Sequence, residues 1–172
     1  MNAATLCDQA VQLKYIGGQY SNIHPTEFIC LAFKLLQIQP EREIIMEYLH
    51  AEDFKYPSVA ASMTDLRYLQ ALAAFYIRLT FPGVECYKIL EPFLNDYRKL
   101  RLRSQTGFHL TFMDEYVDSL LHDERVCDIA LPRIPTRFAL EEADELEPRI
   151  SLLGSEIDSD EDGKMESESD DD

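Results

Sequence analysis

Residues 69–81 read LQALAAFYIRLTF, a run without glycine or proline in which Arg78 is the only charge. Its apolar residues recur at helical spacing along one side, and more of them cover most of the other side. A helix that is apolar nearly all round is buried on more than one side, and this run is too short to cross a bilayer. We therefore expect it to be the central helix of an all-helical domain.

The rest of the body, residues 1–150, shows further helical patterns separated by proline and glycine. Helices are predicted over residues 4–16, 25–37, 40–51, 84–90, 111–122 and 137–146, and a turn or helix over residues 93–103. Gly17 and Gly18 are interpreted as the stop of the first helix, because glycine tolerates the left-handed conformation. Ser104 to Gly107 is predicted to form a turn, and Thr111 and Thr136 are predicted helix caps. No convincing strand is found, so the predicted fold class is all-α: a single compact multi-helix domain with a disordered acidic C-terminal tail.

Charge divides the chain of 172 residues unevenly, with a formal net charge of -16. The segment Ser155–Asp172 carries -9 and the remaining residues carry -7. Residues 151–172 are too polar and too self-repelling to pack, so we predict a disordered acidic tail after the helical domain 1–150. The overall negative balance argues against general electrostatic capture of nucleic acid.

The four cysteines are widely scattered, and Cys7 and Cys30 lie inside apolar helical patterns. This usage is typical of a reducing compartment, where a free cysteine packs as a small hydrophobe. Neither a secretory leader nor a stretch of membrane-spanning length is visible, so we expect the cytosol or the nucleus and no membrane.

Chemistry-bearing motifs are missing from the sequence. The histidines and cysteines lack the short spacings that a zinc site needs, and neither a phosphate-binding loop nor a nucleophile elbow is present. We predict no catalytic residue, no cofactor and no metal, and therefore no enzyme.

Arg98, Lys99, Arg101 and Arg103 form one basic cluster in the body. On the predicted helix, Arg98 and Arg101 share one side, and Lys99 and Arg103 share another. A solvated helix end is one interpretation, since cations suit the C-terminal dipole. Contact with RNA phosphate or with an acidic partner segment is the other, and both stay open.

Four serines of the tail each have an acidic residue three positions later. These candidate phosphorylation sites are Ser155, Ser159, Ser167 and Ser169. An acidophilic kinase reads such a pattern, and each phosphate would add roughly -1.5 to -2 charges. A merely solubilising tail with incidental serines is the alternative.

Ten short blocks of the sequence carry a family resemblance. They are Tyr15–Gly18, Pro25–Leu31, Lys34–Pro40, Glu52–Tyr56, Leu90–Pro92, Asp96–Lys99, Met113–Glu115, Glu124–Asp128, Leu131–Arg133 and Leu146–Arg149. In this order they resemble the pre-mRNA-splicing factor 38 family. Two departures stand out: the upstream segment usual in the family is lacking, and Pro57–Tyr68 is an insertion.

The resemblance implies an α-helical, non-enzymatic scaffold in the nucleus, required for pre-mRNA splicing and spliceosome activation. It also implies that the protein acts in the tri-snRNP and in the pre-catalytic complex. The implied partners are a microfibrillar-associated-protein type splicing factor, a zinc-finger splicing factor and tri-snRNP components. The helical body would present a groove or face to partner helices. The alternative is an RNA-contacting helical module that uses Arg98–Arg103.

Overall fold

The structure is a computed structural model that describes residues 1–51 and 66–150. The chain divides into two units, Met1–Pro135 and a second one beginning at Thr136. No helix of the described residues is long and apolar enough to cross a membrane.

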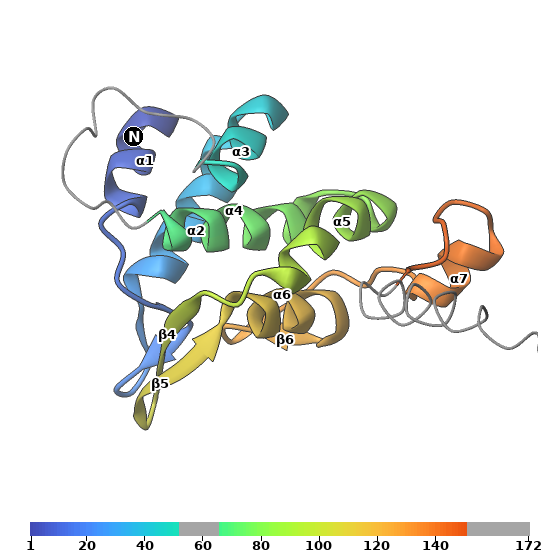
Figure 1. Ribbon diagram of the computed structural model, residues 1–172. Helices are drawn as coiled ribbons and strands as arrows, with labels where there is room; N and C mark the ends of the chain where they lie inside the picture. The colour runs from blue at the N-terminus through green and yellow to red at the C-terminus, as the bar shows by residue number, and fades with distance from the viewer. Residues whose placement is uncertain (52–65, 151–172) are drawn as a thin grey trace, which may run out of the picture. The chain divides into compact units, whose positions relative to one another are not determined.

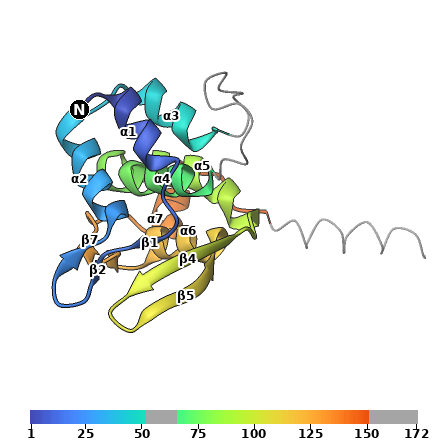
Figure 2. The ribbon, with the colours of Figure 1, turned by 90° about the vertical axis from the view of Figure 1, so that its left-hand side faces the viewer.

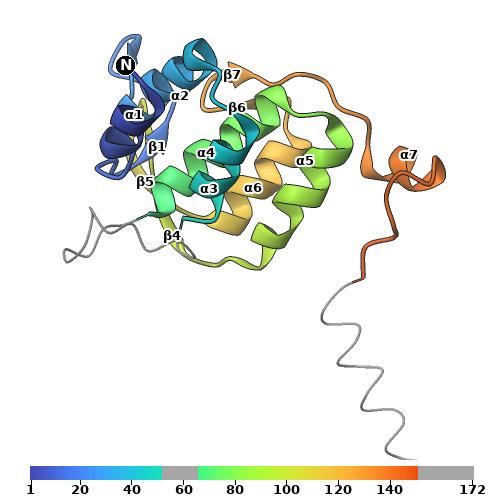
Figure 3. The ribbon, with the colours of Figure 1, turned by 90° about the horizontal axis from the view of Figure 1, so that it is seen from above.

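The predicted central helix is confirmed as α4, Arg67–Thr80. Every residue from Tyr68 to Arg78 is buried. The helix packs against several others of its unit (Figures 1 and 3): α1 (Ala3–Ala10), α2 (Glu27–Ile38), α3 (Arg42–Leu49), α5 (Gly83–Leu90) and α6 (Met113–His122). Neighbours on several sides explain why its sequence is apolar nearly all round.

The predicted all-α fold class is wrong, because the first unit also contains sheets and the fold is α+β. The described residues form one sheet of three strands and two of two strands. The larger sheet holds β1 (Ile16–Gly17), β4 (Lys99–Ser104) and β5 (Gly107–Phe112) in the order β1-β4-β5. The smaller sheets pair β2 (Gln19–Tyr20) with β3 (His24–Pro25), and β6 (Arg125–Val126) with β7 (Ile129–Ala130).

The β4–β5 hairpin replaces the end of the predicted turn or helix 93–103. A short 3-10 helix, η2 (Glu91–Asn95), precedes it. Leu100 and Leu102 alternate with basic residues, which is the period of a strand, and Leu100 is buried. The predicted turn between Ser104 and Gly107 is confirmed, because these residues are the last pair of the antiparallel register. Figure 2 shows β5 as the outer strand of this hairpin.

Gly17 and Gly18 do not stop a helix, since α1 already ends at Ala10. Gly17 is in β1, which runs parallel to β4. Gly18 lies against the backbone of Cys127 and the carboxylate of Asp128, where a β-carbon would overlap both. The pair is glycine because other parts of the chain approach this backbone closely.

The turn that approaches Gly18 joins β6 to β7. Cys127 and Asp128 both have positive φ angles, 50° and 61°, as a tight two-residue hairpin turn requires. The Asp128 side chain then accepts a hydrogen bond from the Gln19 N–H at 2.9 Å. This contact ties the end of the first unit to its beginning.

The helix starts predicted at Pro25 and Thr111 differ from the structure. The helix predicted from Pro25 begins at Glu27, with Thr26 as its N-cap and Pro25 in β3. The predicted cap Thr111 is wrong: α6 begins after Phe112, which makes no side-chain cap. Instead, the Thr111 hydroxyl lies 3.2 Å from Glu115 Oε2 and donates a hydrogen bond to it.

The second unit contains α7, Arg137–Glu142, which ends before the predicted boundary at Leu146. The predicted cap Thr136 is confirmed, because its side chain accepts a hydrogen bond from the Ala139 N–H. Arg137 forms an ion pair with Glu141 one turn later and donates to the Glu147 carbonyl at 3.0 Å. These contacts stabilise a short helix that intrinsic propensity alone would leave marginal.

Two predictions fall partly or wholly outside the described residues. The acidic tail 151–172 lies outside them, as do residues 57–65 of the predicted insertion. The last two residues of that insertion, Arg67 and Tyr68, belong to α4. The Arg67 guanidinium donates to the Lys99 carbonyl at 2.5 Å, so α4 is hydrogen-bonded to the start of β4.

Candidate interaction surface

The predicted basic cluster is divided by the strand geometry of β4. Lys99, Arg101 and Arg103 alternate with leucines and therefore project from one face of the hairpin. The helical pairing predicted for these residues is wrong, because successive side chains in a strand point to opposite faces. Three of the four predicted contact residues are thus brought together, and Arg98 is not among them.

Arg98 belongs to a polar network beside α4. Its guanidinium pairs with Asp96 at 2.6 Å and donates to Gln70 Oε1 at 2.6 Å. The buried Gln70 in turn donates to the Leu49 carbonyl at 3.1 Å. Burial raises the pKa of Asp96, but the hydrogen bonds from Arg98 outweigh burial and hold that pKa below its usual value. Arg98 is therefore a structural residue in this network.

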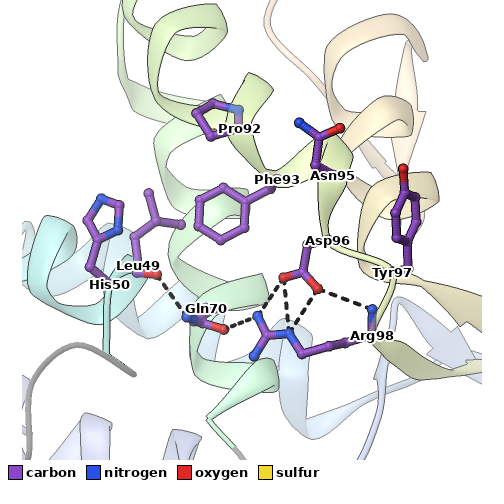
Figure 4. A pocket seen from close by; sticks show the side chains of 9 residues that line it. All are labelled: Leu49, His50, Gln70, Pro92, Phe93, Asn95, Asp96, Tyr97 and Arg98. Atoms are coloured by element: carbon purple, nitrogen blue, oxygen red, sulfur yellow. Dashed lines mark hydrogen bonds and ion pairs between the residues drawn. The ribbon is translucent and has the colours of Figure 1, made fainter. Parts of the chain in front are cut away.

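The network lines a pocket of about 460 Å³ (Figure 4). Its walls come from the end of α3, from α4, from η2 and from the residues that follow η2. The His50 and Phe93 rings lie in this lining, 6.3 Å apart between centroids. The full lining is Leu49, His50, Gln70, Pro92, Phe93, Asn95, Asp96, Tyr97 and Arg98. Sequence reasoning missed this pocket, since long-range packing assembles it.

The outer face of the β4–β5 hairpin combines cations with exposed apolar side chains. We call Lys99, Arg101, Arg103, Phe108 and Leu110 the hairpin face. Phe108 is 51% exposed and Leu110 is 63% exposed. They lie opposite Arg103 and Arg101 in the antiparallel register, so all four project to the same side.

Cation–π contacts order the arginines of the hairpin face. The guanidinium carbons of Arg103 and Arg101 lie 4.5 Å and 5.5 Å from the centroid of the Phe108 ring. Arg103 also lies 5.1 Å from the Tyr20 ring, and Tyr15 contacts Phe108 edge-on at 5.5 Å. Neither arginine forms an ion pair with a carboxylate among residues 1–51 and 66–150. Within the described part of the chain, the charge of these two arginines is therefore not compensated by an ion pair.

The sequence signal for Phe108 and Leu110 was the alternation of residues 108–112. That run alone is too short to indicate a strand. Together with the alternation of residues 99–103 across the turn Ser104–Gly107, it would have indicated a hairpin. The candidate phosphorylation sites Ser155, Ser159, Ser167 and Ser169 lie outside the described residues.

The described cysteines are free and poorly suited to nucleophilic chemistry where they are buried. Burial raises the pKa of Cys86 to about 11 and that of Cys127 to about 12. A thiol with so high a pKa carries little reactive thiolate at neutral pH. Within the part of the chain that the structure describes, no group of three or more histidine, cysteine or acidic residues could hold a metal ion.

Arg78 is the one charged side chain of residues 69–81 and is 4% exposed. Its Nε donates to the Leu120 carbonyl at 2.6 Å, near the C-terminal end of α6, where a cation also suits the helix dipole. Burial lowers its pKa. Its Nη1 has no hydrogen-bond partner among the described residues. The contact with Leu120 gives Arg78 a structural role that joins two helices.

Comparisons with known proteins identify the family. The chain matches the PRP38 family over residues 1–144. It is 54% identical over 151 residues to pre-mRNA-splicing factor 38 of Schizosaccharomyces pombe, covering 88% of this chain and 66% of that protein. It is 48% identical over 160 residues to pre-mRNA-splicing factor 38A of Xenopus tropicalis, covering 92% of this chain and 47% of that protein. The chain thus spans about half the length of the frog relative.

A solved structure has the same fold. A chain of the Snu23–Prp38–MFAP1(217–258) complex of Chaetomium thermophilum is similar with a TM-score of 0.79 and 42% sequence identity. The match covers 95% of this chain and 81% of that one. On the extent of these matches, the chain belongs to the PRP38 family.

Proposed function

We propose that this protein is a non-enzymatic interaction scaffold of the spliceosome, required for pre-mRNA splicing. The relatives that cover most of the chain are pre-mRNA-splicing factors. The similar solved structure is a complex of three proteins rather than an enzyme with a substrate. That similarity, at 42% identity over 95% of the chain, is the observation that carries the proposal.

The proposed partners are an MFAP1-type splicing factor and the zinc-finger splicing factor Snu23, within the tri-snRNP and the pre-catalytic complex. The similar Chaetomium thermophilum complex contains both Snu23 and residues 217–258 of MFAP1. Two features of the first unit suit protein partners. The pocket beside Phe93 has room for an inserted side chain, and the hairpin face offers exposed apolar and cationic groups. A nuclear location follows from this role.

Direct contact with RNA is a second candidate function. Lys99, Arg101 and Arg103 line one strand face, which is an arrangement that can follow a phosphate backbone. Arg98 does not contribute, because Asp96 and Gln70 hold it. Replacing the three outer residues by alanine would lower RNA affinity and flatten its salt dependence. Absence of measurable RNA binding by the unmodified protein would reject this candidate.

Affinity purification from nuclear extract, followed by mass spectrometry, tests the scaffold. The full chain is expected to recover spliceosomal proteins, including MFAP1-type and Snu23-type factors. A matched sample with Phe93→Ala and Leu110→Ala tests whether the two surfaces are used, and circular dichroism checks that it folds. Recovery of no splicing protein by the unmodified chain would count against the proposal.

A further inference from the structure

The open edge of β5 presents backbone hydrogen-bonding groups. β5 is the last strand of the order β1-β4-β5 within the described ranges. Arg101 donates its N–H away from β5, to the Tyr68 hydroxyl at 3.0 Å. In an antiparallel pair, facing residues alternate between those that bond each other and those that point away. Leu110, which faces Arg101, therefore directs its N–H and C=O toward the open edge.

A second backbone hydrogen bond supports the same alternation of bonded and outward-pointing residues. The Met113 N–H donates to the Arg98 carbonyl at 2.9 Å, so the pair of residues 98 and 113 bonds across the hairpin. Every second residue counted back from Met113 is bonded across the hairpin, and this set includes His109. The backbone N–H and C=O groups of Phe108 and Leu110 therefore point outward. Two N–H and two C=O groups thus form a row along this strand without a backbone partner among the described residues.

The side chains of this edge give it no protection against pairing. Edge strands usually carry lysine, proline or a bulge, or are covered by another element. β5 reads GFHLTF and contains neither lysine nor proline, and Phe108 and Leu110 are exposed. An exposed edge of this kind is a ready template for a further strand.

The arginines of β4 carry positive charge out to this edge. Their guanidinium groups lie over the ring of Phe108, which is itself a side chain of the outer strand. A side chain of an added strand would lie about 5 Å from Phe108, within reach of both Arg101 and Arg103. Carboxylates on the added strand would form ion pairs with the guanidinium groups of Arg101 and Arg103.

We propose that β5 accepts an extended acidic segment of a partner protein as an additional strand. The backbone of that segment pairs with Phe108 and Leu110, and its carboxylates pair with Arg101 and Arg103. Strand addition at β5 does not depend on which assembly contains the partner. It is a different mode of binding from a helix that lies in a groove.

Other occupants fit this edge less well. Base stacking by RNA needs an open aromatic face, but Arg103 and Tyr15 already contact the Phe108 ring. The net charge of -16 also repels a long polyanion more than a short peptide. A second copy pairing β5 with β5 would gather the arginines of both copies along one seam, which like-charge repulsion disfavours.

Amide hydrogen exchange measured by NMR on the full chain tests the proposal. The probe is a capped peptide of alternating glutamate and valine, long enough to span β5. At saturation we expect exchange at the Phe108 and Leu110 amides to slow by about tenfold or more, because opening then requires loss of the peptide. The His109 amide, already bonded to β4, is the internal control and should change little.

Two sets of variants separate backbone pairing from charge. Leu110→Pro removes an outward N–H without removing a bond to β4, whereas Leu110→Ala keeps that N–H. The proline variant should lose protection of the Phe108 amide, and the alanine variant should retain it. Arg101→Glu with Arg103→Glu should abolish binding of the glutamate peptide and favour a lysine–valine peptide instead.

Several results would overturn the proposal. They are no binding of the peptide, binding without slower exchange at Phe108 and Leu110, or slow exchange at these amides before peptide is added. The last would mean that the chain itself occupies the edge. Preferential binding of single-stranded oligouridylate would replace the peptide by RNA. If a variant does not fold, the exchange measurement on the unmodified protein still decides.

Discussion

Arg103 and Phe108 face each other across the β4–β5 hairpin, with the guanidinium carbon 4.5 Å from the ring centroid. The register of the hairpin sets this contact. A slip by one residue would move Arg103 to the opposite face of the strand and bring Leu102 to the hairpin face. The turn at Ser104–Gly107 therefore determines which chemistry this surface presents.

Arg98 and Arg101 should differ in their effect on stability, although both belong to one basic run. Arg98→Ala leaves the Asp96 carboxylate and the Gln70 amide without their partner, which should lower the free energy of unfolding by about 1–2 kcal/mol. Arg101→Ala, at an exposed side chain, should change it by less than about 0.5 kcal/mol. Urea denaturation of both variants measures the difference.

The effect of Arg98→Ala should also depend on pH. The pKa of Asp96 is lowered in the folded protein, so the stability it contributes is present above the usual aspartate value of 3.8. It is lost as the pH falls through the lower, folded-state pKa. The difference between variant and unmodified protein should shrink in acid. A difference that stays constant down to acid unfolding would contradict this assignment.

Gly18→Ala should destabilise the first unit by about 1–3 kcal/mol, as overpacked sites do. A β-carbon at this position would overlap the Cys127 carbonyl and the Asp128 carboxylate, so the turn between β6 and β7 must move. Lys14→Ala, an exposed position of the same unit, is the matched control and should be nearly neutral. Equal melting temperatures for the two variants would show that the close approach is absent.

The buried thiols predict a loss of stability in alkali. An unfolded cysteine loses its proton near pH 9, whereas Cys86 keeps its proton to about 11 and Cys127 to about 12. The folded state therefore binds more protons in this window, and stability falls as the pH rises. The slope is at most about 1.4 kcal/mol per pH unit for each thiol.

Urea denaturation in reducing buffer between pH 8 and 11 measures this slope. Cys86→Ala should make it shallower, because one proton-linked group is removed. Cys30→Ala, at an exposed side chain, controls for the loss of a thiol and should leave the slope as it is. A slope unchanged by Cys86→Ala would reject the assignment.

Phosphorylation of the acidic tail stays a prediction from sequence. Protein isolated from cells should carry phosphate at one or more of Ser155, Ser159, Ser167 and Ser169, since each has an acidic residue three positions later. Intact-mass measurement before and after phosphatase treatment tests this. A single unmodified mass from growing cells would speak against it.

The helical core could be predicted because its signals are local. Residues 69–81 are apolar on nearly every side, and Thr136 lies three residues before the N–H that it caps. Burial and capping of this kind depend on side chains close in sequence. The same holds for the turn at Ser104–Gly107, which was predicted without its flanking strands.

The parts missed by sequence reasoning depend on contacts between distant residues. Gly18 is explained by a turn more than one hundred residues later, and the pocket joins His50 to Phe93. The basic residues 98–103 were placed on a helix because four cations are as compatible with a helix end as with a strand. Only pairing with residues 107–112 makes it a strand.

Isothermal titration of this chain with the MFAP1 segment 217–258 tests the scaffold function most directly. The Chaetomium thermophilum Prp38 protein, titrated under the same conditions, is the positive control. The scaffold proposal predicts saturable binding by both proteins. Binding by the control protein together with no heat of binding by this folded chain would contradict it.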